Sequence, residues 1–410
     1  ELTAEKQLFI FRLLSKDVAA EVFSYMDNDT QEHIVQSITD REVRNIVDEM
    51  FLDDTVDFLE EMPANVVKKV LQNADEGTRK TINQFLNYPE NSAGSLMTIE
   101  YVDLHDYFTV RKAMDYIRRT GIDKETVYTC YVIDDQRRLV GQVSLRKLII
   151  APESACIRDI MDTNIVSAAT TDDQEAVADD FRRYDLTSIA VCDKEGRLVG
   201  IITIDDIVDV IQDENTEDIK KMAAIIPSDE DYMKTSVWSL VAHRLPWLML
   251  LMISATFTST IITHFETLLS GAVLLTAFIP MLMDSAGNSG SQTSVTVIRN
   301  LALGEIELRD WPHVLAKEIG VAIVSGAALA LINFLRIIIF TSTSMMIAAV
   351  VSVTLFCTVI IAMIVGCLLP IGAKKLGFDP AVMASPMITT IVDACSLMIY
   401  FLIATSMLGL

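Results

Sequence analysis

Carboxylate side chains crowd one short segment near the middle of the chain. Asp206 and Asp209 lie three residues apart, as do Glu214 and Glu217, and Asp218 follows Glu214 by four residues. On a helix these spacings place each set on one face, where like charges repel and destabilise the helix. A bound cation would make the arrangement favourable, and carboxylate oxygens suit Mg²⁺ or Ca²⁺ better than softer metals. The segment therefore predicts a site for a hard cation, with a solvated connecting helix as the alternative.

A lone carboxylate also lies in apolar sequence near the end of the chain. Asp393 is the one charged residue in the stretch 380–410. An Asp near the centre of a membrane helix costs about 2.5–3.5 kcal/mol on insertion. We therefore expect Asp393 to face a water-filled cavity or a partner, the alternative being a hydrogen bond that packs two helices.

The segment 280–292 interrupts another apolar stretch with Pro280, Gly287, Gly290 and a run of polar residues. This composition predicts a membrane helix that unwinds at mid-depth, where free carbonyls would be ligands for hard cations. The alternative is close packing of small residues between helices.

Five apolar stretches could carry these groups across a bilayer. They cover residues 245–263, 267–298, 319–340, 345–373 and 380–410, and about 20 apolar residues suffice for one crossing. Basic residues flank the first stretch and occupy alternate connections, which predicts a cytoplasmic N-terminus and an extracytoplasmic C-terminus in a cell (inner) membrane. These basic residues are Arg244, Arg299, Arg309, Lys317, Lys374 and Lys375.

The distribution of charge divides the chain into two segments of different composition. The 410 residues are 51% hydrophobic yet carry a net charge of −23, and residues 1–245 hold 27 of the 33 basic and 48 of the 56 acidic side chains. An acidic hydrophilic half is thus followed by an almost uncharged half, which excludes a single soluble domain. The negative field also disfavours nucleic acids and anionic membrane surfaces as partners and favours cations.

The remaining motifs argue against an enzyme. The six cysteines form no C-x-x-C pair, and there is no Walker-type phosphate loop, so reduced thiols are expected and an ATP-driven pump is disfavoured. An intramembrane metalloprotease would need an H-E-x-x-H motif, which the five histidines do not form. They are His33, His105, His243, His264 and His313.

Two repeats organise the acidic half. A repeat of roughly twelve residues predicts short stacked helices over 16–26, 28–38, 40–50, 53–62, 64–72 and 76–86. A second repeat, 128–144 and 188–203, predicts strand, turn, strand and helix twice, and it resembles a CBS tandem pair. Such pairs usually sense ligands and commonly dimerise. Thr203-x-x-Asp206 also resembles a ribose-binding position, so ATP remains a candidate ligand.

Taken together, the chain resembles the MgtE family of magnesium channels over nearly its whole length. The most specific matches are Pro280 with Gly287-Asn288-x-Gly290, the segments 377–380 and 389–393, and 215–219 on the linking helix. The resemblance implies a multidomain membrane protein with an acidic all-α N domain (1–92), two α/β CBS domains (93–155 and 156–213), a linking plug helix (214–240) and a five-helix transmembrane pore domain (241–410).

The resemblance also implies a function. It indicates a homodimeric Mg²⁺ channel for uptake that closes when cytosolic Mg²⁺ binds acidic sites, with an ion-coupled divalent-cation exchanger of the same fold as the alternative. The implied pore residues are Asp393, Gly287 and Asn288. The implied sensor residues are Glu21, Asp53, Asp57, Ser95, Asp173, Glu175, Arg182, Asp185, Asp206, Asp209, Glu214, Glu217, Asp218 and Asp379, with backbone oxygens acting near Ser95 and Arg182. Asp284 and Ser291 depart from the family pattern in the pore segment.

Overall fold

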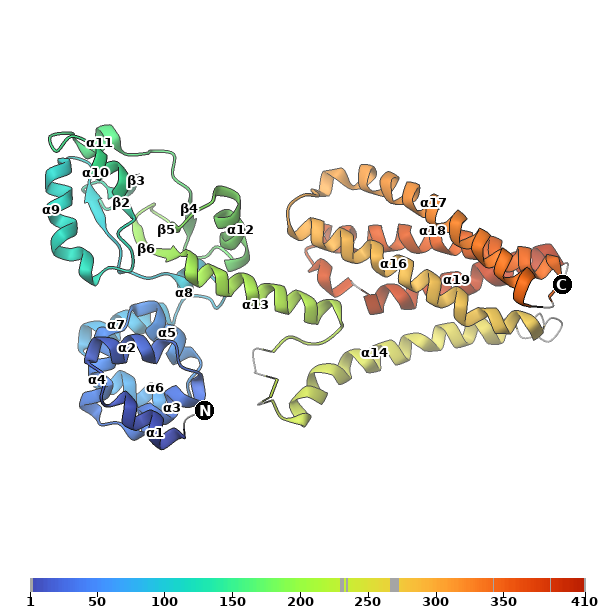
Figure 1. Cartoon of the computed structure of the whole chain (residues 1–410), viewed down its shortest axis with the longest axis horizontal. Helices are drawn as coiled ribbons and strands as arrows, with labels where there is room; N and C mark the ends of the chain where they lie inside the picture. Colours follow the sequence, from blue (N-terminus) through green and yellow to red (C-terminus); the bar gives the residue numbers. More distant parts are fainter. Residues whose placement is uncertain are drawn as a thin grey trace. The chain divides into compact units, whose positions relative to one another are not determined.

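The computed structural model describes residues 3–228, 232–233, 235–265, 273–341, 343–383 and 385–408. The chain forms two compact units, Glu1–Gln212 and Asp213–Leu410, and their elements are labelled in Figure 1.

Short helices build the first part of the first unit. They are α1 (Ala4–Phe11), α2 (Lys16–Ser24), α3 (Asn28–Ser37), α4 (Asp40–Glu49), α5 (Leu52–Glu60), α6 (Ala64–Asn73) and α7 (Glu76–Phe85). Side-chain caps set several of the starts. Asp27 and Asp75 each accept from a backbone N–H in the first turn, and Thr39 forms a capping box with Glu42. The six helices predicted from the repeat are confirmed to within two residues at every end, and α1 precedes them.

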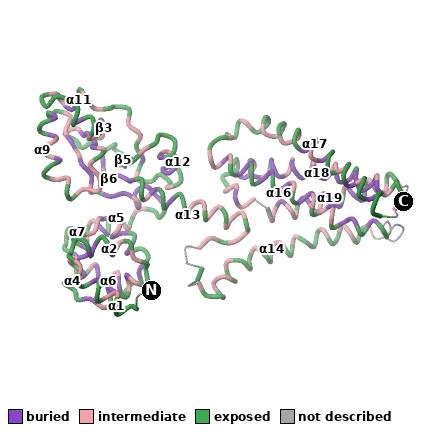
Figure 2. The backbone as a smooth tube through the Cα atoms, in the orientation of Figure 1, coloured by how far each residue is buried: buried purple, intermediate pink, exposed green. Residues whose placement is uncertain are grey.

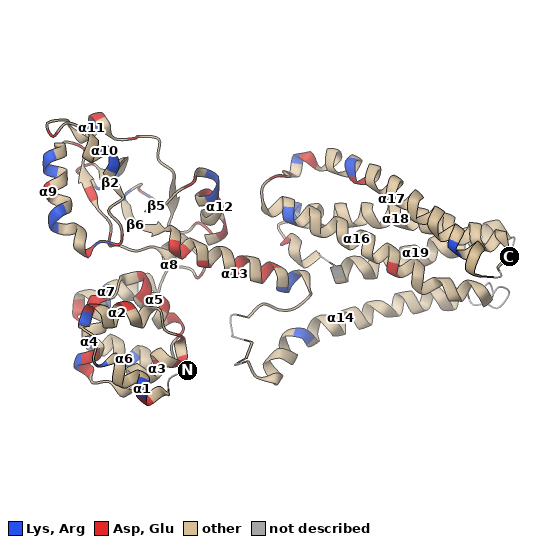
Figure 3. Cartoon of the chain, viewed as in Figure 1, with Lys and Arg blue, Asp and Glu red and all other residues tan. Residues whose placement is uncertain are grey.

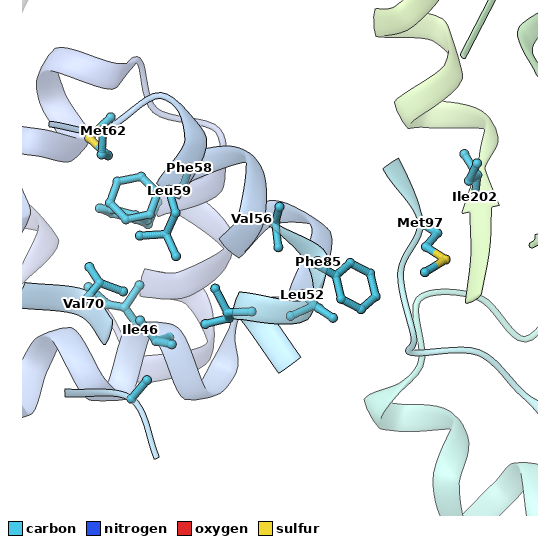
Figure 4. Packing of buried hydrophobic residues seen from close by; sticks show 14 of the residues in the cluster. Ile46, Leu52, Val56, Phe58, Leu59, Met62, Val70, Phe85, Met97 and Ile202 are labelled. Carbon is cyan, nitrogen blue, oxygen red and sulfur yellow. The ribbon is translucent and has the colours of Figure 1, made fainter. Parts of the chain in front are cut away.

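The apolar faces of these helices form one core that continues into the next domain. Val56, Phe58 and Leu59 of α5 are buried in it (Figure 4). The same cluster extends through Met97 to Ile202 of the CBS pair. The helical domain is therefore held against the CBS pair by buried apolar contacts.

The CBS pair repeats one small sheet twice. In each copy the first strand pairs parallel with the second, and the second pairs antiparallel with the third, with a register irregularity at the same place. The first copy comprises β1 (Asp103–His105), α9 (Val110–Thr120), η1 (Gly121–Asp123), β2 (Thr129–Ile133), β3 (Leu139–Ser144) and α10 (Leu145–Ile150). The second comprises α11 (Ile157–Ile160), β4 (Ser167–Ala169), α12 (Gln174–Tyr184), β5 (Ser188–Cys192) and β6 (Leu198–Thr203), and α8 (Ala93–Leu96) precedes both. The predicted repeat of strand, turn, strand and helix is confirmed.

One helix, α13 (Ile204–Met222), leaves the second CBS copy. The sequence suggested a CBS helix over 204–211 followed by a linking helix within 214–240. The structure instead has a single helix through both carboxylate sets, and it ends well before residue 240. The chain turns after Met222, where Ala224 adopts a positive φ of 54°, and the next helix among the described residues is α14.

Long helices dominate the second unit. They are α14 (Val237–His264), α16 (Ile279–Ala302), α17 (Trp311–Phe340), α18 (Met345–Lys375) and α19 (Ser385–Leu408), with 3₁₀ turns η2 (Val273–Phe278), η3 (Leu308–Asp310) and η4 (Pro380–Met383). Among the described residues, four segments are long and apolar enough to cross a membrane, those containing α14, α17, α18 and α19. The 24 residues of α16 span about 36 Å at 1.5 Å per residue, so its length also permits a crossing despite its polar side chains. Figure 2 shows that burial concentrates along α18 and is sparse on α14.

The predicted break in the second span is wrong, because α16 runs unbroken through Gly287, Asn288 and Gly290. The glycines serve close packing instead. A Cβ on Gly287 would lie 3.1 Å from Thr389 Cγ2, and one on Gly290 would lie 2.9 Å from Ile388 Cγ2. The backbone carbonyls therefore remain in the helix, and small residues let α16 approach α19.

This packing makes a stability prediction. Gly366 of α18 faces Gly290 so closely that an added Cβ would overlap the Gly290 carbonyl oxygen. Gly366→Ala should destabilise the folded protein by about 1–3 kcal/mol, the usual effect of overpacking, measured as a lower thermal midpoint in detergent. Gly320→Ala is the matched control, since nothing lies within 4 Å of its added Cβ. Equal midpoints for the two variants would contradict this packing.

Candidate functional site

The first group of candidate ligands lies where the helical domain meets the CBS pair. Asp53 and Asp57 come from α5, and Asp206 comes from the first turns of α13. The Asp53 side chain is only 7% exposed, and its Oδ1 accepts a 3.0 Å hydrogen bond from the Asp54 backbone N–H. In the described part of the chain no lysine or arginine pairs with any of the three carboxylates.

Burial, followed by neighbouring carboxylates, raises the pKa values of all three side chains. Burial raises the pKa of Asp53 well above its ordinary value, and the charges of Asp206 and Asp54 add to the shift. Burial and the Asp206 charge raise the pKa of Asp57 to about 7, and burial raises that of Asp206 to about 6. The ionised cluster is thus unfavourable by itself, and a bound cation would stabilise it.

Three acidic residues in this region escaped the sequence analysis: Asp54, Glu125 and Asp205. Burial, followed by the charges of Asp205 and Asp206, raises the pKa of Glu125 to about 7. Glu125 precedes β2, and Asp54 belongs to α5, so no spacing along the chain relates them. Their proximity follows from how the helical domain packs on the CBS pair, which the sequence does not encode in any local pattern.

The remaining candidates of the first unit lie on several elements. Glu21 and Asp209 are exposed on α2 and α13. Asp173 caps α12 by accepting a 2.9 Å hydrogen bond from the Glu175 backbone N–H, and Asp185 ends the same helix with φ 51°.

Two further candidates were expected to act through their backbone oxygens. Arg182 forms an ion pair with Asp179 at 2.8 Å. The Ser95 hydroxyl donates a 2.9 Å hydrogen bond to the Ser92 carbonyl. Across the residues that the structure describes, no group of three or more His, Cys, Asp or Glu side chains is arranged to hold a metal by itself.

In the second unit, the end of α13, whose charged residues are coloured in Figure 3, contacts α16 and the loop before η4 in the bundle of long helices. Lys221 Nζ lies 2.6 Å from Glu217 Oε1 and 2.8 Å from Asp379 Oδ2. Asp379 precedes η4, and its Oδ1 accepts a 2.8 Å hydrogen bond from the Ala381 backbone N–H. Burial, then the Asp379 charge, raises the pKa of Asp218. The contacts bring candidate residues of the linking helix and of the loop together, with a lysine between them.

Asp393 lies partly buried on α19, the helix whose Ile388 and Thr389 pack against Gly290 and Gly287 of α16. The charge of Asp284 on α16 is near enough to act on it. Gly287 is buried against Thr389, while Asn288 is exposed. Exposed polar residues continue along successive turns of α16 at Asp284, Asn288, Gln292 and Thr296, which form the polar stripe of α16.

Comparison with known proteins covers every part of the chain described above. Residues 279–403 match the family described as a divalent cation transporter, residues 1–91 match the MgtE intracellular N domain, and 93–154 and 157–213 match the CBS domain. The magnesium transporter MgtE of Thermus thermophilus is 36% identical, with 100% of this chain and 91% of the relative covered. That of Bacillus subtilis is 33% identical, with 99% and 92% covered.

A solved structure extends the similarity to the fold of the first unit. The crystal structure of the soluble part of a magnesium transporter superposes with a TM-score of 0.50 at 32% identity. It covers 52% of this chain and 84% of that one.

The cluster of Asp53, Asp57 and Asp206 makes the packing of α5 against the CBS pair depend on pH. Because the folded pKa values of Asp57 and Asp206 lie at about 7 and about 6, above their ordinary value, the contact is most stable at low pH and weakens as pH rises through that range. In Mg²⁺-free buffer, hydrogen exchange of α5 amides, corrected for intrinsic rates, should be slower at pH 5.5 than at pH 8.

Asp57→Asn should flatten this pH dependence, whereas Asp48→Asn, at an exposed position of α4, should not. Protection that increases with pH in the unmodified protein would contradict the assignment.

Proposed function

The chain belongs to the MgtE family of magnesium transporters, and from that membership we propose that it is a homodimeric Mg²⁺-selective channel for Mg²⁺ uptake. It is a membrane transporter rather than an enzyme. In this proposal, cytosolic Mg²⁺ bound to the acidic sites closes the pore, so that uptake is limited by its own product.

The polar stripe of α16 is the observation that best supports a pore. Asp284 and Asn288 are exposed on a helix that has the length of a membrane span. Hydrocarbon would leave such groups unsolvated at a cost of several kcal/mol each. A second copy of the chain and a column of water between the two copies would satisfy them. The stripe therefore favours a pore at the interface of two copies.

Mg²⁺ chemistry fits the residues that would line this pore. Mg²⁺ dehydrates reluctantly and is commonly held through its waters by one or two carboxylates. Asp393 would supply the carboxylate, and Asn288 would supply a polar side chain that accepts hydrogen bonds from the hydrated ion. Gly287 would act indirectly, because its missing side chain lets α16 approach Thr389 of α19.

An exposed apolar face of the first CBS copy supports association of two chains. Tyr128 is 74% exposed, and it lines one shallow surface hollow together with the exposed Ile149 and Ile150 of α10. Clusters of large exposed apolar side chains mark interaction surfaces in soluble domains. We assign this face to the contact between two copies of the CBS pair.

Gating follows from carboxylates that pair with no lysine or arginine among the described residues. Without Mg²⁺, the charges of Asp53, Asp57 and Asp206 oppose close packing of the helical domain on the CBS pair. Mg²⁺ would bind the compact state more tightly and shift the population toward it. Ten-fold preference at one site is worth about 1.4 kcal/mol, and several sites together could supply the roughly 5.5 kcal/mol of a full switch.

The other sensor residues are proposed to act in the same way with water, backbone oxygens or the second copy. They are Glu21, Ser95, Asp173, Glu175, Arg182, Asp185, Asp209, Glu214, Glu217, Asp218 and Asp379. The acidic half would face the cytosol and the C-terminus the opposite side, so the membrane potential would drive entry at about 2.3 kcal/mol per charge per 100 mV.

ATP binding to the CBS pair is a separate part of the proposal. The Thr203 hydroxyl donates a 3.0 Å hydrogen bond to Asp206 Oδ2, and both groups could turn to a ribose hydroxyl. Because Asp206 is also a proposed Mg²⁺ ligand, ATP and Mg²⁺ would influence each other's binding.

Replacing the pore carboxylate tests the proposed conduction. Asp393→Asn keeps the shape of the side chain but removes its charge, and a charged contact is worth about 1.5–3 kcal/mol. Mg²⁺ uptake into proteoliposomes should fall about ten-fold or more. Glu305→Gln, at an exposed loop position outside the membrane helices, should transport as the unmodified protein does. Equal uptake by both variants would remove Asp393 from the conduction path.

A further inference from the structure

A lysine occupies the space between two of the proposed Mg²⁺ ligands. The Lys221 ammonium lies within 3 Å of carboxylate oxygens of both Glu217 and Asp379, and its side chain is 23% exposed. Glu217 belongs to the linking helix and Asp379 to the loop before η4. The lysine thus joins the two elements that a bridging Mg²⁺ would have to join.

Other contacts also hold the end of α13 at this position. We call the region where residues 215–222 of α13 contact the bundle the seat of α13. Met222 packs against a small apolar cluster of Ile298 and Ala381. Arg299 of α16 donates a 3.3 Å hydrogen bond to the Asn215 side chain. The ion pairs of Lys221 therefore lie among apolar and polar contacts that hold the same helix end against the bundle.

The neighbouring lysine makes a different contact. Lys220 Nζ donates to the Ser228 backbone carbonyl, which belongs to the turn after α13 and not to the bundle. Two adjacent lysines of one helix end thus differ in what they join. Of these two lysines, Lys221 is the one that pairs with Asp379 and so connects α13 to the loop before η4.

We propose that Lys221 acts as a tethered cation, which holds the linking helix against the Asp379 loop when Mg²⁺ is scarce and competes with Mg²⁺ for Glu217 and Asp379. The inference rests on the proposed function, because it concerns how the gate responds to Mg²⁺. An ammonium carries one charge on a flexible stem, whereas Mg²⁺ carries two. Mg²⁺ would displace the lysine toward solvent and hold the same two carboxylates more tightly.

This competition would set the Mg²⁺ concentration at which the seat tightens. With Lys221 present, the ion must displace a bound charge, which raises the concentration required. Without Lys221, the carboxylates repel each other at low Mg²⁺, yet they offer Mg²⁺ a more negative site. A lysine at this position therefore keeps the seat partly formed at low Mg²⁺ and shifts its response to higher Mg²⁺.

Hydrogen exchange of the end of α13 in the full chain, reconstituted in lipid nanodiscs, tests the inference during a Mg²⁺ titration. Lys221→Met should lose protection of residues 215–222 in Mg²⁺-free buffer. It should regain protection at saturating Mg²⁺, with a midpoint about five-fold or more below that of the unmodified chain, the scale of a typical coupling between ligands. Lys221→Arg should keep the Mg²⁺-free protection because it retains the charge.

Lys220→Met is the matched control, because it removes a neighbouring lysine that makes no contact with Asp379. If Lys221→Met matches Lys220→Met at every Mg²⁺ concentration, the inference is overturned. If Mg²⁺ protects no variant while Lys221→Met still loses protection in Mg²⁺-free buffer, the lysine contact is supported. That result would overturn both its competition with Mg²⁺ and the proposed gating by this site.

Discussion

Carboxylates that are held away from bulk water, with no lysine or arginine of the described residues paired to them, are the constraint on which the rest of this molecule depends. Apolar contacts from Phe58 through Met97 to Ile202 press the helical domain onto the CBS pair, and this packing buries Asp53 beside Asp206. Folding therefore creates an electrostatic strain that it does not relieve. In the membrane half the same principle applies to Asp393 and to the polar stripe of α16, for which hydrocarbon is an unfavourable neighbour. Hydrated divalent cations could satisfy both regions.

The carboxylates at the end of α13 differ from those between the helical domain and the CBS pair, because a lysine reaches them. At the contact between the helical domain and the CBS pair, no lysine or arginine of the described chain reaches the three carboxylates. At the bundle, Lys221 reaches two. The first arrangement has no internal substitute for Mg²⁺, whereas the second has a weak one. A chain with both kinds of contact would respond to Mg²⁺ in stages, the helical domain and the linking helix each with its own threshold.

Much of this architecture could be predicted from local patterns, because helix caps, twelve-residue periodicity and the repeated CBS segments act over short stretches of chain. The apolar spans could be predicted equally well. The backbone conformation of the polar segment 280–292 could not, because Gly287 and Gly290 suit an unwound backbone and a close helix contact equally well. Only the position of Ile388 and Thr389 decides between them. The surroundings of Glu125 and the contact of Lys221 with Asp379 were missed for a related reason, because the residues that meet there lie far apart in sequence. The linking helix was misjudged in length because α13 continues the CBS helix without a break.

The most direct test of the account is to record single-channel Mg²⁺ currents from excised inside-out patches containing this protein while cytosolic Mg²⁺ is stepped from micromolar to millimolar concentrations. The account predicts unitary Mg²⁺ currents whose open probability falls as cytosolic Mg²⁺ rises, with the unitary conductance itself retained in the openings that remain. Mg²⁺ flux without unitary steps that follows the gradient of a counter-ion would contradict it, and would identify the protein as an ion-coupled exchanger built on the same fold.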